Sequence, residues 1–337
     1  MKYHTIGINF FVYFQHIRLM KKIIITGVSS FIGFHLAKFF SRNYKVYGTL
    51  SMKFNNYNDI NKLRLNSIVG NVTFIEDFNL MNHNDIKKTI SNIKPDYFIH
   101  HAGWSKLYSS FDYDLDKGFN TNVIPLSFLF SSLKESNCKG IILTGSSAEY
   151  SDGEIPDLET DICYPSMPYG FVKLSQSIYA KQLSNQYNLP TRLARVYIPF
   201  GPFDSPNKLL PYVINNLYND RPSKLSSCTQ IRDFIYIDEL VKIYEFLLLD
   251  LTNQNFEIYN CASGKPLQLI SLLKLIAEEM CKPLELLDFS SIKTRELDQK
   301  YSCANNVKLK EKYNVIGDMD IMDGVKDYLN FIRKNNF

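Results

Sequence analysis

The stretch Lys22–Gly33, with the sequence KIIITGVSSFIG, decides the fold of this chain. It begins with a continuous apolar run, which is typical of a strand in a parallel sheet that is covered on both faces. A turn of small residues follows, and the apolar spacing then becomes that of a helix over Phe31–Phe40. A strand, a tight turn and a helix in this order predict the first unit of a βαβ sheet.

The same alternation continues as far as Val196. Further strands are predicted at Lys45–Leu50, Val72–Ile75, Tyr97–His100, Gly140–Thr144 and Thr191–Val196, with helices at Asp85–Ile93, Val123–Ser136 and Lys173–Tyr187. We therefore predict an α/β fold in which residues 20–196 form a Rossmann doubly wound parallel sheet. Later residues form Pro- and Asn-rich loops, short strands and helices such as Asp238–Leu249 and Leu269–Met280. We expect residues 197–337 to form a smaller C-terminal α/β substrate-binding domain, partly interleaved with the first.

Composition and charge exclude several classes of protein. The 337 residues are 45% hydrophobic, which supports a substantial core and excludes disordered, collagen-like and disulfide-scaffold proteins. The net charge of +4 gives no reason to expect a nucleic-acid or membrane partner. All six histidines lie at or before His101, which argues against a His-rich metal site in the rest of the chain, and we expect no metal. The six cysteines are scattered without a C-x-x-C pair, so we expect reduced thiols and a cytoplasmic protein.

Residues 1–19 need a separate interpretation. They contain the short apolar run Ile6–Phe14 but no small-residue cleavage site of a signal peptide, and Met20 stands directly before the first strand. We expect Met20 to be the true start and residues 1–19 to be a non-native or disordered extension.

The turn between the first strand and helix has the features of a pyrophosphate-binding loop. Gly27 permits a sharp turn, Gly33 permits close contact between helix and sheet, and the backbone N–H groups at the helix start can hold phosphate. Ser29, Ser30, Phe31 and Ile32 complete this loop. A purely structural turn is the alternative interpretation.

The second strand bears on the choice of dinucleotide. Sites for NAD usually place an acidic residue about 20 positions after the first glycine, on the ribose 2′-hydroxyl. No Asp or Glu occurs here before Asp59, whereas Ser51 and Lys53 can favour a 2′-phosphate and Arg42 is expected nearby. We therefore predict NADP(H) as the preferred cofactor, with NAD(H) as the alternative. Two alternatives stay open. Lys53 can instead be a solvated surface residue, and Asp77 can be either an adenine ligand or a loop cap.

Tyr169 and Lys173 form a Y-x-x-x-K pattern, which places both side chains on one face of a helix. An ammonium beside the phenol favours phenolate and lowers its pKa. A second match, Tyr113 and Lys117, lies among three aspartates that would oppose a phenolate. The Tyr169 match follows a proline-rich helix start and a strand end at which Ser146 can hydrogen-bond a carbonyl oxygen, so we prefer it.

These motifs together resemble the extended short-chain dehydrogenase/reductase family, in particular its nucleotide-sugar branch, over nearly all of residues 21–337. The resemblance is carried by residues 26–33, 99–103, 122, 146–150, 169–173, 195–202 and 230–238. Two departures are Ser30, where the family usually has glycine, and Ile198, where many relatives have asparagine. Residues 207–214 and 301–306 look like the CDP-abequose synthase group of 4-ketoreductases.

The resemblance implies roles for individual residues. Tyr169 would be the acid/base, Lys173 its partner and a ribose ligand, and Ser146 the donor to the carbonyl oxygen. Further cofactor contacts are implied for Phe78, His101, Ala102, Gly103, Asn122 and Ile198. Substrate contacts are implied for Ser105, Ser147, Asn207, Leu210, Gln230, Arg232 and Arg295. Arg232 would meet the diphosphate of a nucleotide sugar, with a surface salt bridge to Asp233 as the alternative. Relatives often form homodimers through two helices, here Val123–Ser136 and Lys173–Tyr187, although a core-facing stripe explains their apolar residues equally well.

Three reactions compete within this branch. The 4,6-dehydratases carry an acid two residues after the catalytic Ser or Thr, where this chain has Ala148, with Glu149 one step out of register. Epimerases retain NAD and have the acidic ribose ligand that is missing here. We therefore predict NADPH-dependent reduction of the C4 keto group of a nucleotide-activated 4-keto-6-deoxy or 3,6-dideoxy hexose, for surface polysaccharide biosynthesis. A nucleotide-sugar epimerase is the alternative, and a non-catalytic NADP(H) sensor is the minor one.

Overall fold

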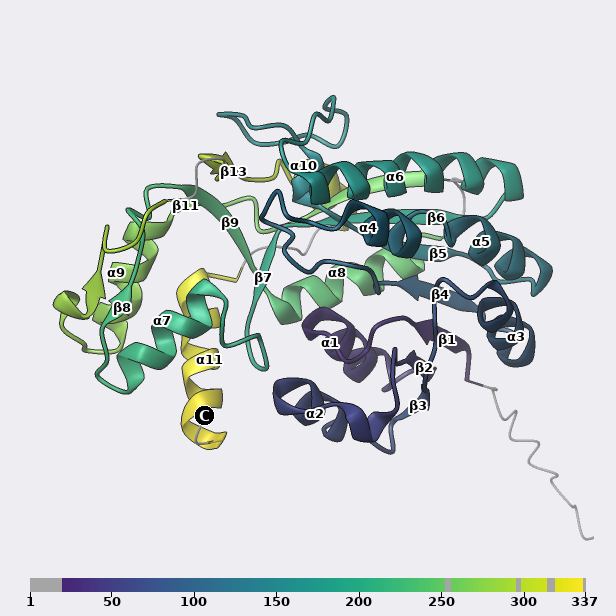
Figure 1. Ribbon diagram of the computed structural model, residues 1–337, viewed down its shortest axis with the longest axis horizontal. Coiled ribbons are helices and arrows are strands. Elements are labelled where there is room, and N and C mark those ends of the chain that lie inside the picture. The colour runs from purple at the N-terminus through teal and green to yellow at the C-terminus, as the bar shows by residue number, and fades with distance from the viewer. Residues whose placement is uncertain (1–19, 252–255, 295–297, 314–318, 336–337) are drawn as a thin grey trace, which may run out of the picture.

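The computed structural model describes residues 20–251, 256–294, 298–313 and 319–335. The larger layer contains strands β1 Lys22–Ile25, β2 Lys45–Thr49, β3 Val72–Ile75, β4 Tyr97–His100, β5 Ile141–Ser146, β6 Thr191–Val196 and β10 Phe256–Cys261. Its helices are α1 Phe31–Phe40, α2 Asp59–Asn66, α3 His83–Ile93, α4 Leu115–Asn122, α5 Leu126–Glu135, α6 Pro168–Tyr187 and α8 Ile237–Leu249. The strands pair in the order β10-β6-β5-β4-β1-β2-β3, and every pair is parallel. The predicted Rossmann-type α/β fold is therefore confirmed (Figure 1).

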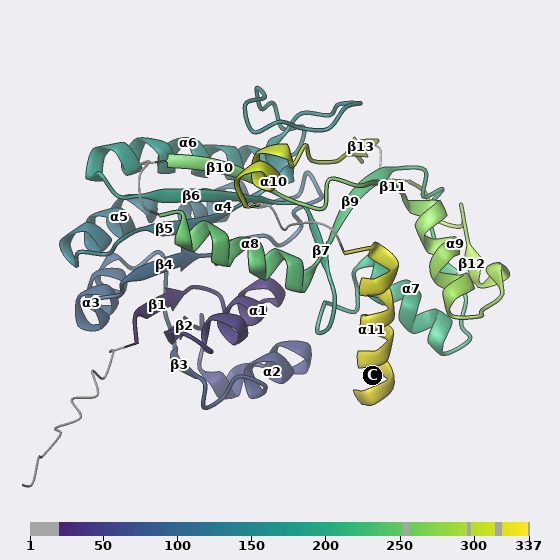
Figure 2. The same ribbon diagram turned by 180° about the vertical axis from the view of Figure 1, so that it is seen from behind.

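Helices cover both faces of this sheet, which explains why its strands are apolar throughout. The face shown in Figure 1 carries α3, α4, α5 and α6, and the face shown in Figure 2 carries α1, α2 and α8. Ile24 belongs to the same buried cluster as Leu129 of α5 and Leu183 of α6, whereas its neighbours Ile23 and Ile25 belong to the cluster on the opposite face. All three isoleucines are fully buried, as a parallel strand between two helical layers requires.

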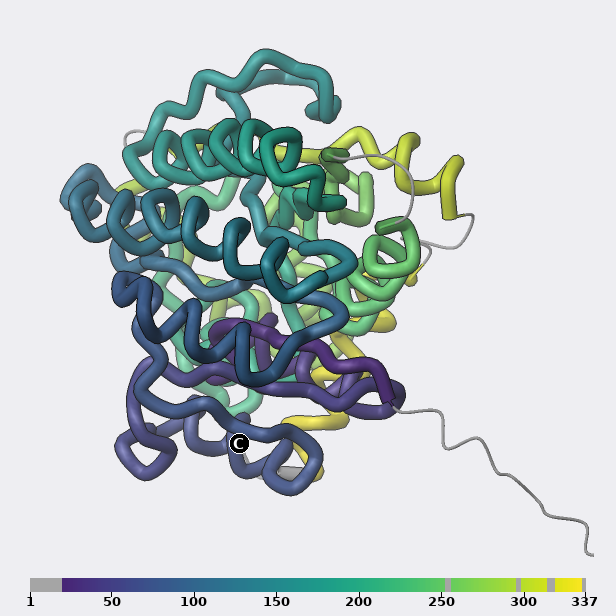
Figure 3. Tube along the Cα trace, turned by 90° about the vertical axis from the view of Figure 1, so that its right-hand side faces the viewer, coloured from purple at the N-terminus to yellow at the C-terminus, as the bar shows by residue number. Residues whose placement is uncertain are grey.

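The smaller lobe follows the sixth strand. Its strands are β7 Ile198–Phe200, β8 Ser223–Lys224, β9 Ile231–Tyr236, β11 Pro266–Gln268, β12 Leu287–Asp288 and β13 Tyr301–Ser302. Its helices are α7 Leu209–Tyr218, α9 Leu269–Glu279 and α11 Ile321–Asn335, while α10 Val307–Tyr313 packs on β10. Figure 3 shows the blue and teal helices of the sheet layer in front of the yellow C-terminal segments. One apolar cluster runs from α1 and α8 into this lobe, and β10 returns to complete the main sheet. The chain is thus interleaved; the division at residue 197 stays a prediction.

Several boundaries differ from the sequence prediction for identifiable reasons. The helix predicted at Val123–Ser136 starts at Leu126, because Pro125 caps it and separates it from α4. Helix α6 starts at Pro168, in the first-turn position that proline favours, and therefore includes Tyr169. Helix α2 was not predicted. The predicted extension at residues 1–19 lies outside the described residues. No helix in the described part of the chain is long and apolar enough to span a membrane.

Candidate active site

The loop between β1 and α1 is built so that its two glycines cannot be replaced without strain. Gly27 has a φ of +74°, and a Cβ there would lie 3.1 Å from the Cα of Ala102. A Cβ on Gly33 would lie 2.2 Å from the carbonyl oxygen of Gly27. The first glycine therefore provides a left-handed turn, and the second lets α1 close onto that turn.

Ser30 replaces the usual middle glycine without strain. Its φ of −76° is ordinary for any residue, and its hydroxyl donates to the Gly27 carbonyl at 2.8 Å and accepts the Gly33 N–H at 3.1 Å. The first turn of α1 contains no acidic residue, so the positive end of the helix is free to attract an anion. The loop thus fits the pyrophosphate of a dinucleotide.

A cleft of about 1860 Å³ runs from this loop between the sheet layer and the smaller lobe. Most residues predicted for the cofactor and substrate line it, namely Gly27, Ser29, Ser30, Ile32, Ser51, Asp77, Phe78, His101, Ala102, Gly103, Ser105, Asn122, Ser146, Ser147, Tyr169, Lys173, Ile198, Asn207, Leu210 and Arg232. Four predicted residues lie outside its lining: Phe31, Gly33, Lys53 and Gln230. Arg295 lies outside the described residues. The structure therefore gathers residues from both ends of the chain into one cleft.

Lys173 is held by α6 beneath Tyr169. Its ammonium donates to the carbonyl oxygen of Thr144 at 2.5 Å and to the side chain of Gln176. Burial lowers the pKa of Lys173 to about 8, and the Glu149 carboxylate opposes that shift. The pKa of Tyr169 is raised, because burial penalises the phenolate, although a hydrogen bond with Ser146 acts in the other direction. The lowered pKa that we expected for Tyr169 is thus wrong, because the penalty of burying the phenolate dominates.

The second Y-x-x-x-K match lies behind the cleft. Tyr113 is buried and donates to the carbonyl oxygen of Trp104 at 2.9 Å, while Lys117 pairs with Asp114. Neither Tyr113 nor Lys117 lines the cleft. The Tyr113 ring packs edge-on against Tyr169, with centroids 5.7 Å apart. This second match supports the ring of Tyr169 and does not form a second reactive pair.

The cleft wall around Trp104 and His101 is also fixed by hydrogen bonds. The Asn122 carboxamide accepts the Trp104 N–H at 2.7 Å and donates to the Trp104 carbonyl at 3.1 Å. A ring nitrogen of His101 lies 3.2 Å from the Thr144 hydroxyl. Burial lowers the pKa of His101 to about 3, so His101 presents a neutral imidazole to the cleft.

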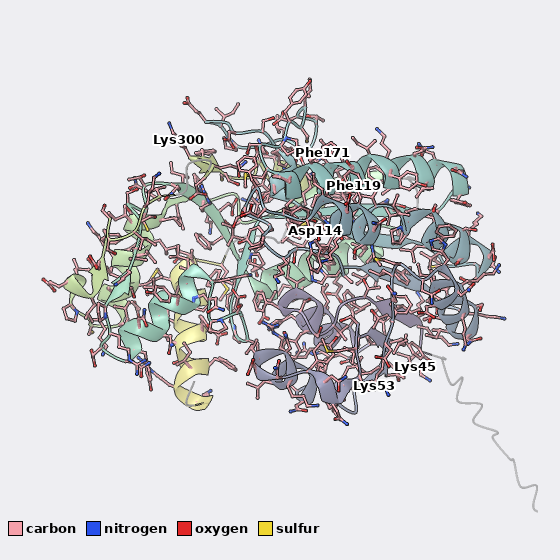
Figure 4. All side chains as sticks on the ribbon, viewed as in Figure 1. Lys45, Lys53, Asp114, Phe119, Phe171 and Lys300 are labelled. Carbon is pink, nitrogen blue, oxygen red and sulfur yellow. The ribbon has the colours of Figure 1, made fainter. Side chains whose placement is uncertain are left out.

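The carboxyl end of β2 differs from the sequence prediction. Ser51 lies in the cleft and contacts the Tyr57 hydroxyl at 3.1 Å. Lys53 is exposed near α2, outside the cleft (Figure 4). Arg42 does not lie nearby: it follows α1 in the turn that leads to the amino end of β2, with its guanidinium over Phe39. The expected proximity of Arg42 is wrong because α1 runs antiparallel to the strands.

Two residues at this end were missed by the sequence analysis. Glu76 directly follows β3, and its carboxylate accepts the Phe54 N–H at 3.2 Å, beside the segment after β2. An acid at the end of a neighbouring strand was the available signal. Arg64, on the unpredicted α2, is buried and donates to the carbonyl oxygens of Ser29 at 3.1 Å and Phe203 at 2.7 Å. It ties the glycine loop to the start of the smaller lobe.

Arg232 on β9 faces the far end of the cleft. Its guanidinium pairs with Asp298 at 2.7 Å, and Gln230 donates to the same carboxylate at 2.8 Å. The alternative of a surface bridge to Asp233 is wrong, because the Asp233 carboxylate is fully buried and accepts N–H bonds from the backbone after β10, including that of Ser263 at 2.9 Å. Arg232 and Asp298 therefore form a charged pair in the cleft wall.

The comparisons with known proteins agree with the fold. The sequence profile of the NAD dependent epimerase/dehydratase family matches residues 23–262. The chain is 24% identical to a UDP-glucuronate 4-epimerase of Thermodesulfobacterium geofontis, over 93% of this chain and 96% of that protein. It is 24% identical to the CDP-abequose synthase of Salmonella muenchen, over 92% and 97% respectively. The structure of UDP-glucose 4-epimerase from Thermotoga maritima superposes with a TM-score of 0.80 at 22% identity, covering 94% of this chain and all of that one.

Proposed function

This chain belongs to the NAD dependent epimerase/dehydratase family, and on that premise we propose that it uses NADPH to reduce the C4 keto group of a nucleotide-activated 4-keto-6-deoxy or 3,6-dideoxy hexose. The observation that carries the proposal is the chemistry of the Ser146 turn. Ser146, Tyr169 and Lys173 line one cleft with the glycine loop. The residue two positions after Ser146 is Ala148, which also lines the cleft and has only an inert methyl group. Elimination of water needs an acid there, and Glu149 is buried in an ion pair with Arg195.

The side chains suit a reduction. A bound nicotinamide cofactor would supply the hydride. The raised pKa of Tyr169 keeps its phenol protonated, and a proton donor is what the new oxygen requires. The Ser146 oxygen accepts the Ala148 N–H at 3.2 Å, and the Ser146 hydroxyl also bonds to Tyr169. A carbonyl oxygen bound between the two side chains would take the Ser146 hydrogen from Tyr169. Lys173, with a pKa of about 8, stays cationic near neutral pH and stabilises the phenolate that proton transfer leaves.

The wall beside Tyr169 supports a deoxy sugar. Trp104, Tyr108 and Met167 line the cleft there and carry no charge, and Tyr108 packs edge-on against the Tyr169 ring. Lys117 lies 5.1 Å from the centre of the Trp104 ring, but it pairs with Asp114 and does not line the cleft. Lys173 is committed to Thr144 and Gln176. Such a wall accommodates a methyl group at C6 and gives no partner to a carboxylate there.

The other end of the cleft suits a nucleoside diphosphate. Arg232 offers a guanidinium, which can bind phosphate oxygens in a bidentate manner, once it exchanges its partner Asp298. Asn207 and Leu210, at the start of α7, line the same region. We assign these three residues to the nucleotide part of the substrate.

We propose NADP(H) as the preferred cofactor. The absence of Asp and Glu before Asp59 supports this choice, as does the position of the Ser51 hydroxyl in the cleft. Glu76 favours the alternative, because a carboxylate beside the ribose end would repel a 2′-phosphate. It therefore also favours the second candidate function, an epimerase that retains NAD.

We also propose a cytoplasmic homodimer. All six cysteines are free thiols, as is usual in a reducing compartment. Ile124, Phe128, Phe171 and Ile178 are exposed around α5 and α6. Figure 4 shows Phe171 beside Phe119 of α4 on the same side of the molecule. A contiguous exposed apolar patch of this kind is typical of a protein interface.

The test is a rate measurement with a panel of substrates. NADPH loss is followed with CDP-, GDP- and dTDP-linked 4-keto-6-deoxyhexoses and with the CDP-linked 4-keto-3,6-dideoxy sugar, with NADH in parallel. Oxidation with one of them supports the reductase and identifies its base. Co-purified NAD with interconversion of C4 epimers, and no net oxidation, would replace it with the epimerase. Binding of NADPH without any turnover, and a biological role that survives Tyr169→Ala, would indicate a sensor.

A further inference from the structure

A buried carboxylate lies directly behind the Ser146 turn, and the reaction proposed above does not use it. Glu149 ends the short 3₁₀ turn Ser147–Glu149 and is fully buried. Its Oε1 accepts the backbone N–H of Ser146 at 2.9 Å, while the Ser146 hydroxyl accepts the Ala148 N–H at 3.2 Å. These reciprocal bonds form a capping box. These two bonds fix the Ser146 oxygen, and neither of them uses the hydrogen of the Ser146 hydroxyl.

The same carboxylate holds the turn to α6. Its Oε2 accepts the Ser177 hydroxyl at 2.8 Å, and that hydroxyl also lies 3.0 Å from the carbonyl oxygen of Lys173. A second contact reinforces this attachment, since a Cβ on Gly170 would lie 2.1 Å from the Ala148 carbonyl oxygen. The turn that carries Ser146 and the helix that carries Tyr169 and Lys173 are therefore joined at two points.

Arg195 compensates the buried charge. Its Nε lies 2.9 Å from the Glu149 carboxylate, and both side chains are at most 4% exposed. The guanidinium also lies over the Tyr150 ring at 4.5 Å. A buried carboxylate is tolerated only when it is paired and hydrogen-bonded, and the pairing here leaves Oε1 available to Ser146.

We propose that Glu149 is a positioning residue: its carboxylate holds the Ser146 hydroxyl and the α6 residues Tyr169 and Lys173 in one geometry for the reaction. This inference rests on the proposed reduction, because it gives Glu149 a part in turnover. If the Glu149–Arg195 pair only stabilised the fold, a variant that keeps the fold but loses the bond to Ser146 would react normally.

Two double variants separate these possibilities. Both replace Arg195 with Met, so that no buried cation is left without its partner. Glu149→Gln with Arg195→Met keeps an oxygen that can accept the Ser146 N–H, and Glu149→Leu with Arg195→Met removes it at similar volume. We expect the Leu variant to have a kcat roughly 100-fold below that of the Gln variant, which is the scale of a displacement of about 1 Å in an active site, at an unchanged KM for the sugar nucleotide. Equal kcat values in the two folded variants would overturn the proposal.

A second readout does not depend on activity. Hydrogen exchange of the peptide that covers residues 146–150 should be faster in the Leu variant than in the Gln variant, because the Ser146 N–H has lost its acceptor. If the wild-type protein reduces none of the substrates, the proposed function fails, and this exchange still decides the geometric claim; equal exchange would refute it. Ser177→Ala serves if both double variants fail to fold, since it removes one bond to Glu149 and leaves the ion pair. It should lower kcat severalfold at constant KM, and an unchanged kcat would count against the proposal.

Discussion

Replacement of Tyr169 by phenylalanine should remove most turnover and leave the fold and the cofactor site intact. The Tyr169 ring packs edge-on against Tyr108 and Tyr113, with centroids 5.8 and 5.7 Å away, and phenylalanine keeps both contacts. The change removes only the hydroxyl, which bonds to Ser146 and whose pKa burial raises. The variant therefore lacks the proton donor, while the packing around the ring is unchanged.

The size of the effect follows from this geometry. A positioned acid contributes about 10²- to 10⁴-fold to a rate, which is a barrier of roughly 3–5 kcal/mol at about 1.4 kcal/mol per tenfold. Loss of one neutral hydrogen bond changes the free energy of unfolding by only about 1 kcal/mol. We thus expect a fall in kcat of about 10²- to 10⁴-fold, with nearly unchanged stability and NADPH affinity.

The assay compares initial rates of NADPH loss, urea unfolding and a fluorescence titration with NADPH. Tyr113→Phe is the matched control, because it removes a neighbouring hydroxyl that does not line the cleft and that bonds to the Trp104 carbonyl oxygen. We expect its kcat to stay within about tenfold of the wild type, a change of about 1.4 kcal/mol in the barrier. If Tyr169→Phe also stays within that range, Tyr169 is not the acid and the reasoning is refuted.

Three further predictions follow from the structure. Gly33→Ala places a Cβ 2.2 Å from the Gly27 carbonyl oxygen. The resulting shift of the loop should lower the free energy of unfolding by about 1–3 kcal/mol and weaken NADPH binding, which a melting curve and a titration measure. Unchanged binding would show that the loop does not hold the cofactor. Burial lowers the pKa of His35 from 6.5 to about 4, so the folded state binds fewer protons than the unfolded chain between these values. The free energy of unfolding should therefore fall by up to about 3 kcal/mol as the pH drops through that window; urea unfolding of His35→Gln should show a smaller fall, and an identical pH profile would contradict the assignment. Glu76→Gln removes the carboxylate that accepts the Phe54 N–H after β2 and should lower the KM for NADPH relative to that for NADH. If the ratio of the two KM values does not change, Glu76 does not affect the choice of cofactor.

The fold could be predicted because each strand of the main sheet is a local apolar run bounded by a turn. Ile23, Ile24 and Ile25 show this within three residues, since helices on both faces require them to be apolar together. Helix α2 escaped prediction because its residues are mostly polar and only Arg64 and Leu65 are buried. Local periodicity cannot show a helix that buries only two of its side chains, one of which is an arginine.

The cleft could be predicted only where its residues belong to motifs. The glycine loop and the Tyr169–Lys173 pair are each set by local spacing. The positions of Arg42 and Glu76 depend on which end of the strands a turn reaches. Arg232 and Asp298 are 66 positions apart in the chain. The Lys173 ammonium reaches the Thr144 carbonyl oxygen only because β5 ends beside α6. Such contacts follow from tertiary packing, which single-residue patterns do not contain.

The return of β10 to the main sheet has a consequence for the order in which the nascent chain can fold. Strand β6 ends at Val196, but its outer neighbour β10 begins only at Phe256. Until that later segment has been synthesised, β6 presents an unpaired edge of backbone N–H and C=O groups, which is a template for association with other chains. The Tyr150 hydroxyl also has its hydrogen-bond acceptor on β10, at Asn260, so this bond forms only after β10 has been synthesised. A fragment that stops after the sixth strand would therefore be prone to aggregate, whereas a chain that extends past Cys261 can pair β10 with β6.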